Sequence, residues 1–427
     1  MEQTLLIKTI NCPQCQGIVY EHPDYVTWCE KCNWNVLPEG NMQPSSLFDK
    51  LYLKAGKKQS EGLLNSMIRN GSLPPKISFR KILFLAFCTF IHIISLILCL
   101  SGIYLIIAEF PHVLPMIIGS FLLLLAWTTR PRGYRLDTKP LSREQFPAAY
   151  QIVDEIASIT GAQKVHGIII DGRFNASIAQ TGLRKKQIIY LGLPLLSILE
   201  KQEFTSLVAH EIAHGMNGDL NRSFFVSSTI SSLITWYQMI KPTKLFDTDV
   251  NSFLIALGLL PVNIFLLLVS RLIYLSLYLI CHLNWFDSQR AEYLADRYAA
   301  EITGKDGLLS FLNKLHLQSL FDFCIQKTAN DPGVNSLFDE LQNRVKRIPD
   351  KELERIKRVY SMSDSRLDAT HPPTANRILY IDTLKISAPK YELTDELYNR
   401  FRNEITPLKP VMELKILDEY KVNVLGW

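Results

Sequence analysis

The sequence predicts a mostly helical α+β fold that is embedded in a membrane and carries a small separate unit at its amino terminus. The first observation is the composition: hydrophobic residues make up 48% of the 427 residues, and the mean hydropathy is +0.08. The apolar residues are concentrated in a few long runs, as in membrane proteins. The second observation is that helix-period patterns fill most of the remaining chain, with β-rich runs only between residues 165 and 192. The third is a pair of Cys-x-x-Cys motifs near the amino terminus.

Residues 1–38 are predicted to form a metal-binding ribbon. Cys12 and Cys15 are separated by 13 residues from Cys29 and Cys32. Four thiolates at this spacing predict a structural zinc ion in tetrahedral coordination. So short a unit has little core, so its folding would depend on the metal. Two disulfides are the alternative, which a cytosolic location disfavours. The partner of the ribbon is left unknown.

A linker and a membrane hairpin follow the ribbon. Residues 39–80 contain Pro- and Gly-rich stretches, one short predicted helix and a basic end, as is typical of a linker that meets a membrane surface. Residues 81–129 are predicted to form a transmembrane hairpin from the apolar runs 82–108 and 113–129. Because a bilayer needs about 20 apolar residues, the first run is long enough to cross it and the second is short.

The charges around this hairpin predict its orientation. Glu109 is the only charged residue between the two runs. The flanks are basic: Lys54, Lys57, Lys58, Lys76, Arg80 and Lys81 precede the hairpin, and Arg130, Arg132, Arg135 and Lys139 follow it. Under the positive-inside rule, both ends of the hairpin and the amino terminus are expected in the cytosol. The net charge of +5 therefore reflects membrane flanks, and no nucleic-acid binding is expected.

Residues 130–223 are predicted to begin an α+β domain. The Ser-Arg-Glu-Gln segment at residues 142–145 resembles a capping box, which predicts a helix from there to about Thr160. Three β-rich runs predict strands, the last two paired as a hairpin: 165–171, 174–180 and 187–192. A further helix-period pattern at residues 202–216 predicts a helix beside this small sheet.

That second helix carries the most informative motif, His210-Glu211-Ile212-Ala213-His214. Residues four apart lie on one helix face, so both imidazoles can bind the same ion. Glu211 lies beside them, placed to take a proton from a water that the metal activates. This is the spacing of a catalytic zinc site. The alternative is two histidines on an ordinary helix.

Glu292 offers the third zinc ligand. It lies four residues before Asp296 on a predicted helix, so Glu292 would complete a His-His-Glu site and Asp296 would orient a ligating histidine. A solvated acidic helix face is the alternative. The related zinc motif with a third histidine fits worse, because the chain has Asn217 and Leu220 where that motif needs Gly and His.

The metal site also constrains the segment between its two halves. Residues 224–283 contain the apolar runs 224–240 and 253–283. If His214 and Glu292 bind one ion, the chain between them crosses the membrane an even number of times, which predicts about four spans in all. The alternative keeps both runs embedded against the domain without a full crossing. Residues 284–393 would complete the domain, and residues 394–427 form a tail without a motif.

Taken together, these motifs resemble those of membrane-embedded zinc metallopeptidases of the HtpX-like and CAAX prenyl protease type. Four blocks carry the resemblance, in the order of the family: 173–177, 210–219, 292–296 and 370–378. They lie within about residues 140–380. The chain departs from the family pattern at Ser177 and at residues 178–180, where relatives often carry an aromatic residue and a more glycine-rich turn.

The resemblance implies roles for further residues. It implies a zincin-type peptidase fold in which Glu211 is the general base and His371 stabilises the oxyanion together with the metal. Asn175 and Ala176 would lie on an edge strand that binds an extended polypeptide through main-chain hydrogen bonds. Arg377 is expected either to hold the His371 segment through an ion pair or to contact the substrate.

The implied function is that of a multi-pass membrane zinc endopeptidase with its active site in the cytosol, at the inner membrane if the cell is bacterial. Quality control of membrane or misfolded proteins is the expected role. Two zinc ions are expected, one catalytic and one structural. Processing of prenylated proteins is the alternative within this enzyme class. A membrane scaffold with a vestigial protease site is the alternative from another class, and the intact Glu211 disfavours it.

Overall fold

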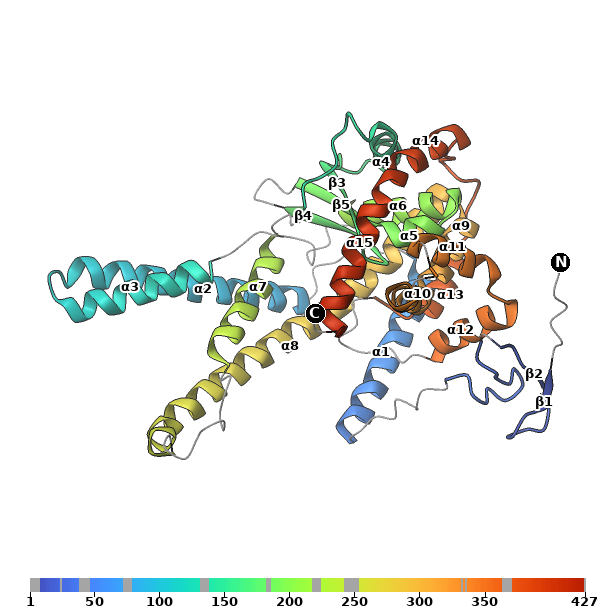
Figure 1. The fold of residues 1–427 in the computed structure, drawn as a ribbon. Coiled ribbons are helices and arrows are strands. Elements are labelled where there is room, and N and C mark those ends of the chain that lie inside the picture. The colour runs from blue at the N-terminus through green and yellow to red at the C-terminus, as the bar shows by residue number, and fades with distance from the viewer. Residues whose placement is uncertain are drawn as a thin grey trace.

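The computed structural model consists of a helical body, two helical hairpins that project from it and a small amino-terminal unit (Figure 1). The structure describes residues 8–23, 25–37, 47–71, 79–130, 138–181, 186–216, 224–241, 253–331, 333–334, 336–362 and 371–425. Asn217-Gly218-Asp219, Thr370 and the predicted turn at residues 182–185 lie outside the described residues.

The elements of the amino-terminal half are β1 (Thr9–Asn11), β2 (Ile18–Tyr20), α1 (Leu47–Asn70), α2 (Phe79–Ala108), α3 (Val113–Thr128), α4 (Pro147–Thr160), β3 (Gly167–Asp171), β4 (Ala176–Thr181), β5 (Lys186–Gly192), α5 (Leu193–Ile198) and α6 (Lys201–Met216). Those of the other half are α7 (Phe224–Ile240), α8 (Phe253–Thr303), α9 (Lys305–Leu315), α10 (Gln318–Asn330), α11 (Leu337–Arg347), α12 (Asp350–Met362), α13 (Thr374–Thr383), α14 (Asp395–Ile405), η3 (Thr406–Leu408), α15 (Lys409–Tyr420) and the π-helical η4 (Lys421–Leu425).

Helices α2 and α3 form a hairpin that extends to the left in Figure 1, while α7 and the first part of α8 extend to the lower left. Within the described residues, the segments Phe79–Ala108 and Pro261–Thr303 are long and apolar enough to cross a membrane. Helix α3 is apolar but has only 16 residues, and α7 has 17. Two candidate spans are therefore present in the described part, and the crossing of α3 and α7 stays a prediction.

The α2–α3 hairpin exposes most of its large apolar side chains and packs closely along its own axis. Tyr104 is 63% exposed and Phe121 is 56% exposed, as expected for side chains that lipid covers. A Cβ atom added to Gly102 would lie 2.8 Å from the carbonyl oxygen of Gly119, and the reverse contact is equally short. Small residues at both positions allow this close helix approach.

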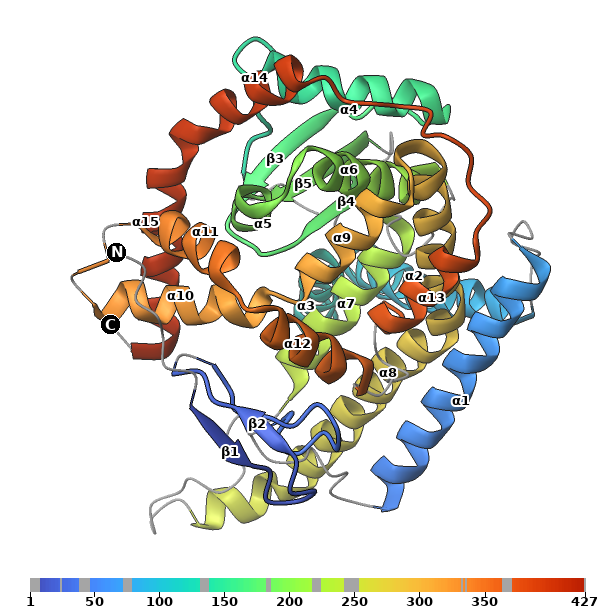
Figure 2. The ribbon, with the colours of Figure 1, turned by 90° about the vertical axis from the view of Figure 1, so that its right-hand side faces the viewer.

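A three-stranded sheet of order β3-β5-β4 lies in the centre of the body beside α6 (Figure 2). Strands β4 and β5 are antiparallel, which confirms the predicted hairpin, and Ile178 pairs with Ile189. Strand β3 runs parallel to β5, with Ile168 opposite Ile189. Buried side chains of the sheet, α4 and α6 share one hydrophobic core, and β4 forms one of the two edges of the sheet.

The predicted start of the first catalytic-domain helix is wrong. Helix α4 begins at Pro147, and the Ser142 hydroxyl instead donates a hydrogen bond to the Glu144 carboxylate. Proline is favoured at the first helical position because its missing N–H costs nothing there. The free N–H groups of Ala148 and Ala149 donate to the carboxylate of Glu404, at 2.7 and 3.0 Å. The cap therefore comes from a distant helix and not from a local box.

The predicted helix in the linker is present, but its predicted short length is wrong, because α1 has 24 residues and packs against the body. Its buried residues Leu63, Leu64 and Met67 pack with Tyr293 of α8 and Tyr380 of α13. A helix with an apolar stripe of this kind gains most of its stability from such packing.

Helices α14 and α15 likewise pack into the catalytic core. The Phe401 ring of α14 stacks on Phe204 of α6, with centroids 4.4 Å apart. The hydroxyl of Tyr398 donates to the carbonyl of Leu199, and Glu413 of α15 accepts the N–H of Leu337 at the start of α11. The segment predicted as a tail thus supports the helix that carries the HExxH motif.

Candidate metal centre

The start of α6 is fixed by a buried carboxylate that the sequence analysis missed. Glu203, 4% exposed, accepts the backbone N–H of Glu200 at 2.6 Å, as in a capping box. The same carboxylate accepts hydrogen bonds from Ser310 and Lys314, both at 2.6 Å. The sequence does carry a signal for this cap: Glu203 follows Glu200, the residue before α6, by three positions, which is the spacing of a capping box.

The structure brings His210, His214 and Glu292 together in the buried interior. Their side chains meet between α6 and α8, and the three residues are 4%, 1% and 3% exposed. The two Nε2 atoms are 3.2 Å apart, and they lie 3.5 and 3.2 Å from the oxygens of Glu292. Ligands bound to zinc at about 2.0–2.1 Å in a tetrahedron lie roughly 3.3 Å from one another. The donor types and their spacing therefore fit one zinc ion.

Asp296 and Arg377 form a buried ion pair behind this triad. Asp296 lies one helical turn after Glu292, and one of its oxygens is 3.0 Å from Nδ1 of His210. Its two oxygens also accept from Nη2 and Nε of Arg377, at 2.6 and 2.8 Å. A carboxylate on Nδ1 fixes the histidine tautomer that presents Nε2 to a metal. Arg377 is 4% exposed, so the structure places it behind the metal centre.

The charges at this site favour a bound cation. Burial alone lowers the pKa of His210, but hydrogen bonds to Asp296 and Glu292 outweigh it and raise the pKa to about 9. The guanidinium of Arg377 balances the charge of the buried Asp296 through two hydrogen bonds. The carboxylates around His210 thus favour a positive charge at this position against the cost of burial. A divalent metal can supply that charge.

Glu211 and His371 are the two other catalytic residues that the sequence predicts. Glu211 is 4% exposed and follows His210 directly on α6. The His371 ring is half-exposed, and its Nδ1 lies 3.0 Å from Oε1 of Glu292. The backbone carbonyl of His371 accepts a hydrogen bond from the buried side chain of Gln289 at 2.9 Å. Gln289 was not predicted, since a single glutamine three residues before a metal ligand carries no signal of its own.

The predicted substrate strand begins where the sheet approaches the HExxH helix. Asn175 is exposed and its carbonyl accepts the N–H of Gly192 at 2.9 Å, while Ala176 is buried and opens β4. A Cβ atom at Gly192 would fall 1.8 Å from the carbonyl oxygen of Arg173, so this position requires glycine. Since Ala176 faces the core, only its backbone is placed to contact a bound peptide.

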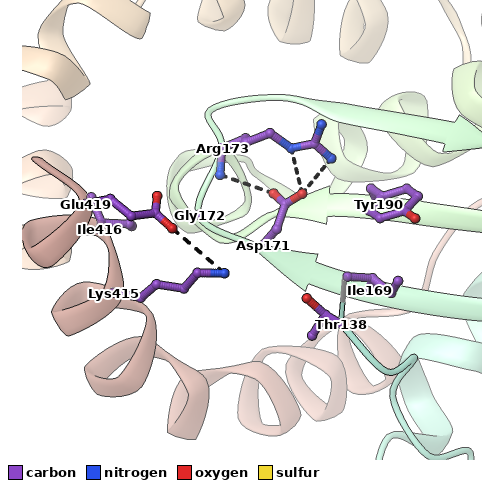
Figure 3. Close-up of a pocket in the computed structure, with 9 residues that line it drawn as sticks. All are labelled: Thr138, Ile169, Asp171, Gly172, Arg173, Tyr190, Lys415, Ile416 and Glu419. Carbon is purple, nitrogen blue, oxygen red and sulfur yellow. Dashed lines mark hydrogen bonds and ion pairs between the residues drawn. The ribbon is translucent and has the colours of Figure 1, made fainter. Parts of the chain in front are cut away.

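A separate cavity of 310 Å³ lies between this sheet and α15 (Figure 3). Asp171 and Arg173 form an ion pair at its wall, at 2.6 Å, with Tyr190 beside them and Lys415 across the cavity. None of the predicted metal ligands lines this cavity.

The four ribbon cysteines form a second cluster that fits a metal. The Sγ atoms of Cys12 and Cys32 are 3.6 Å apart, as are those of Cys15 and Cys29. Sulfur ligands at about 2.3 Å from a tetrahedral zinc ion lie roughly 3.8 Å apart, whereas a disulfide needs about 2.05 Å. The cluster therefore supports the predicted zinc ribbon and not the disulfide alternative.

The two Cys-x-x-Cys motifs fold in the same way. In each, the first cysteine's carbonyl accepts a backbone N–H from the residue four positions later, Gln16 or Asn33, at 2.9 Å. The residue that ends each turn has a positive φ, which is 59° for Gln16 and 60° for Asn33. The two tight turns aim both pairs of thiols at one point, which is the geometry of paired zinc knuckles.

We expect the purified protein to hold two zinc ions per chain. A chelator should remove one ion more readily, because a three-ligand site keeps an open position while four thiolates enclose the other metal. Replacing Cys12 and Cys29 together by Ser should leave one zinc, measured by metal analysis of the intact chain. A count of two in this variant would rule out a ribbon site.

Comparison with known proteins agrees with this site. The profile of peptidase family M48 matches residues 148–385, which include all residues of the triad. The chain is 26% identical over 246 residues to a Protease HtpX homolog of Pyrobaculum calidifontis, covering 56% of this chain and 69% of the relative. It is 24% identical over 245 residues to the homolog of Pyrobaculum aerophilum, covering 56% and 68%. No solved structure matches the chain.

Proposed function

This chain belongs to peptidase family M48 and is a membrane-associated zinc metalloprotease, and we propose that it cleaves unfolded or misfolded polypeptides internally at the cytosolic face of the membrane. The observation that carries the proposal is the buried set of His210, His214 and Glu292 next to Glu211. These side chains supply three metal ligands and a base, which together are sufficient for metal-assisted hydrolysis.

The residues around the triad divide the reaction between them. Zinc, when bound, supplies Lewis acidity at the scissile carbonyl and lowers the pKa of the attacking water. Glu211 takes the proton of that water on a carboxylate oxygen and later delivers it to the leaving amine. His371, held through its backbone by Gln289, donates a hydrogen bond to the developing oxyanion. Asp296 keeps His210 in the orientation that ligation needs.

Substrate enters as an extended chain beside β4. Since β4 forms the edge of its sheet, its outward main-chain groups can pair with a peptide strand, and the exposed Asn175 lies at its start. Pairing through main-chain groups does not depend on the side chains of the substrate. It requires an extended segment with free N–H and C=O groups, so it favours unfolded or flexible polypeptide over folded domains. The buried position of Arg377 supports a role in holding the site rather than in contacting substrate.

The membrane segments support a cytosolic active site next to the bilayer. Helix α8 continues without a break from its apolar part to Glu292. Glu292 lies nine residues beyond residue 283, the end of the apolar run, which corresponds to about 14 Å along a helix. The basic flanks of the first hairpin favour the same side for the peptidase domain and the ribbon.

Single cysteines test this topology in intact cells with an impermeant thiol reagent. We expect labelling from outside at Glu109→Cys and at Asp247→Cys, and none at Lys390→Cys, which is 58% exposed on the peptidase body. Labelling at residue 109 but not at residue 247 would show that the second pair of segments is embedded without crossing. Outside labelling at residue 390 would reverse the proposed orientation.

An assay with three substrates tests the proposed reaction. The protein in detergent should cleave a chemically unfolded polypeptide at internal bonds, and the same polypeptide in its folded form far more slowly. Chelation should stop the reaction and added zinc should restore it. Cleavage confined to a prenylated peptide would favour the processing role instead, and zinc binding without any hydrolysis would favour a scaffold.

A further inference from the structure

Within the described residues, helix α12 connects the ribbon to the peptidase body, and three of its basic residues lie on a single face. Lys351, Arg355 and Arg358 are spaced four and three residues apart, so they project on the same side. The ribbon lies beside α12 in both views of the molecule, on the side of the body away from the α2–α3 hairpin (Figures 1 and 2). The ribbon itself lies outside the segment that matches the peptidase family, residues 148–385, whereas α12 lies inside it.

Each of these three residues donates a hydrogen bond to a backbone carbonyl of the ribbon. Lys351 bonds the carbonyl of Tyr20 at 3.0 Å, and Arg355 bonds that of Val36 at 2.8 Å. Arg358 bonds the carbonyl of Glu30, between Cys29 and Cys32, at 2.6 Å.

Arg358 has two further contacts with the ribbon. Its guanidinium donates to the side-chain oxygen of Asn33 at 2.9 Å and lies 4.9 Å from the ring centre of the buried Trp28. Backbone carbonyls keep fixed positions only while the ribbon is folded. Because this unit has little core of its own, its fold depends on the four thiolates holding a metal. The contacts of α12 therefore depend on the metal state of the ribbon.

On its other side, α12 is tied to the elements of the metal centre. It packs against α13, which carries Arg377 and follows His371 after two prolines. Tyr360 of α12 also stacks on the buried His316 at the end of α9, with ring centres 4.0 Å apart and planes 13° from parallel. Arg377 bonds Asp296, and Asp296 in turn contacts His210. A continuous set of packed groups thus connects the ribbon to the active site.

We propose that the ribbon, through Lys351, Arg355 and Arg358, positions α12 and α13 so that His371 and Arg377 are held for catalysis, and that loss of the ribbon metal slows turnover. The inference rests on the proposed peptidase function for its kinetic part only. The three basic residues are positioning residues, since none of them touches the metal centre.

The test uses the full-length protein with Arg355→Ala and Arg358→Ala combined, and with Cys12→Ser and Cys29→Ser combined. Arg347→Ala is the control, because Arg347 is exposed at the end of α11 and makes none of the ribbon contacts described here. Three quantities are measured: kcat and KM on an unfolded polypeptide, zinc per chain, and amide hydrogen exchange of residues 371–383.

We expect kcat to fall roughly three- to tenfold in either double variant, with KM changed less than about twofold. Exchange of residues 371–383 should rise, while the catalytic zinc stays bound. Combining both pairs of substitutions should cost no more than one pair, because both break the same connection. Arg355→Ala combined with Arg358→Lys, which keeps the charge and a donor group at position 358, should lose less than the double alanine variant.

Three results would overturn the inference. A rise in KM with kcat unchanged would mean that the ribbon recruits substrate. Unchanged kcat, KM and hydrogen exchange would mean that the ribbon is attached to α12 without positioning the active site. Additive losses would show independent effects. If the unaltered protein hydrolyses no polypeptide, the proposed function fails, while hydrogen exchange of residues 371–383 still decides whether the ribbon positions the site.

Discussion

Glu211→Gln should lower peptide hydrolysis by about 10²–10⁴-fold while the chain keeps its zinc. The amide has the shape of the carboxylate but cannot accept a proton from the attacking water. Glu211 is not among the three converging ligand residues, so its replacement should leave the metal content unchanged. Kinetics on an unfolded polypeptide, together with zinc analysis of the same preparation, measure both effects.

Two further variants make this experiment specific. Glu292→Ala should lose activity together with the catalytic zinc, because it removes a ligand. Glu396→Gln, at an exposed position in the first turn of α14, makes the same chemical change away from the site and should keep normal turnover. Near-normal turnover in the Glu211→Gln protein would rule out the proposed base.

The metal ligands could be predicted because most of them lie close together in the sequence, and their spacing determines which side chains can bind the same ion. His210 and His214 lie one turn apart on a helix, and this fixes their separation before any tertiary contact is known. The cysteines of the ribbon are similar, since each Cys-x-x-Cys turn places its own two thiols. Glu292 was identified by its spacing from Asp296, and the structure places both beside His210.

Other features depend on partners that are distant in sequence. The residue that caps α4, Glu404, lies 256 and 255 positions from the N–H groups of Ala148 and Ala149 that it accepts, so the local sequence pointed to Ser142 instead. Helix α1 looked like part of a linker because its apolar residues find their partners on α8 and α13. Gln289 was missed because a single polar residue signals nothing until its hydrogen-bond partner is known. Glu203 does occupy a capping-box position, but that position can be recognised only once the first residue of α6 is known.

Arg377→Ala should destabilise the folded protein by roughly 3–5 kcal/mol, the usual cost of leaving one member of a buried ion pair without its partner. Asp296 would keep its negative charge in a site with no exposed surface, and only His210 would remain to balance it. Thermal or denaturant unfolding of the purified protein measures this loss. Arg400→Ala, at an exposed position on α14, should change stability little.

The same variant separates the two roles considered for Arg377. The ion-pair role predicts that Arg377→Met together with Asp296→Asn recovers part of the stability, since neither residue then leaves a buried charge unpaired. It also predicts weaker retention of the catalytic zinc in the double variant, because that variant lacks the Asp296 carboxylate that orients His210 as a ligand. Native stability with a raised KM would instead mean direct substrate contact. The 4% exposure of Arg377 and its two hydrogen bonds to Asp296 favour the ion pair, because a side chain used in this way has no face left for a peptide.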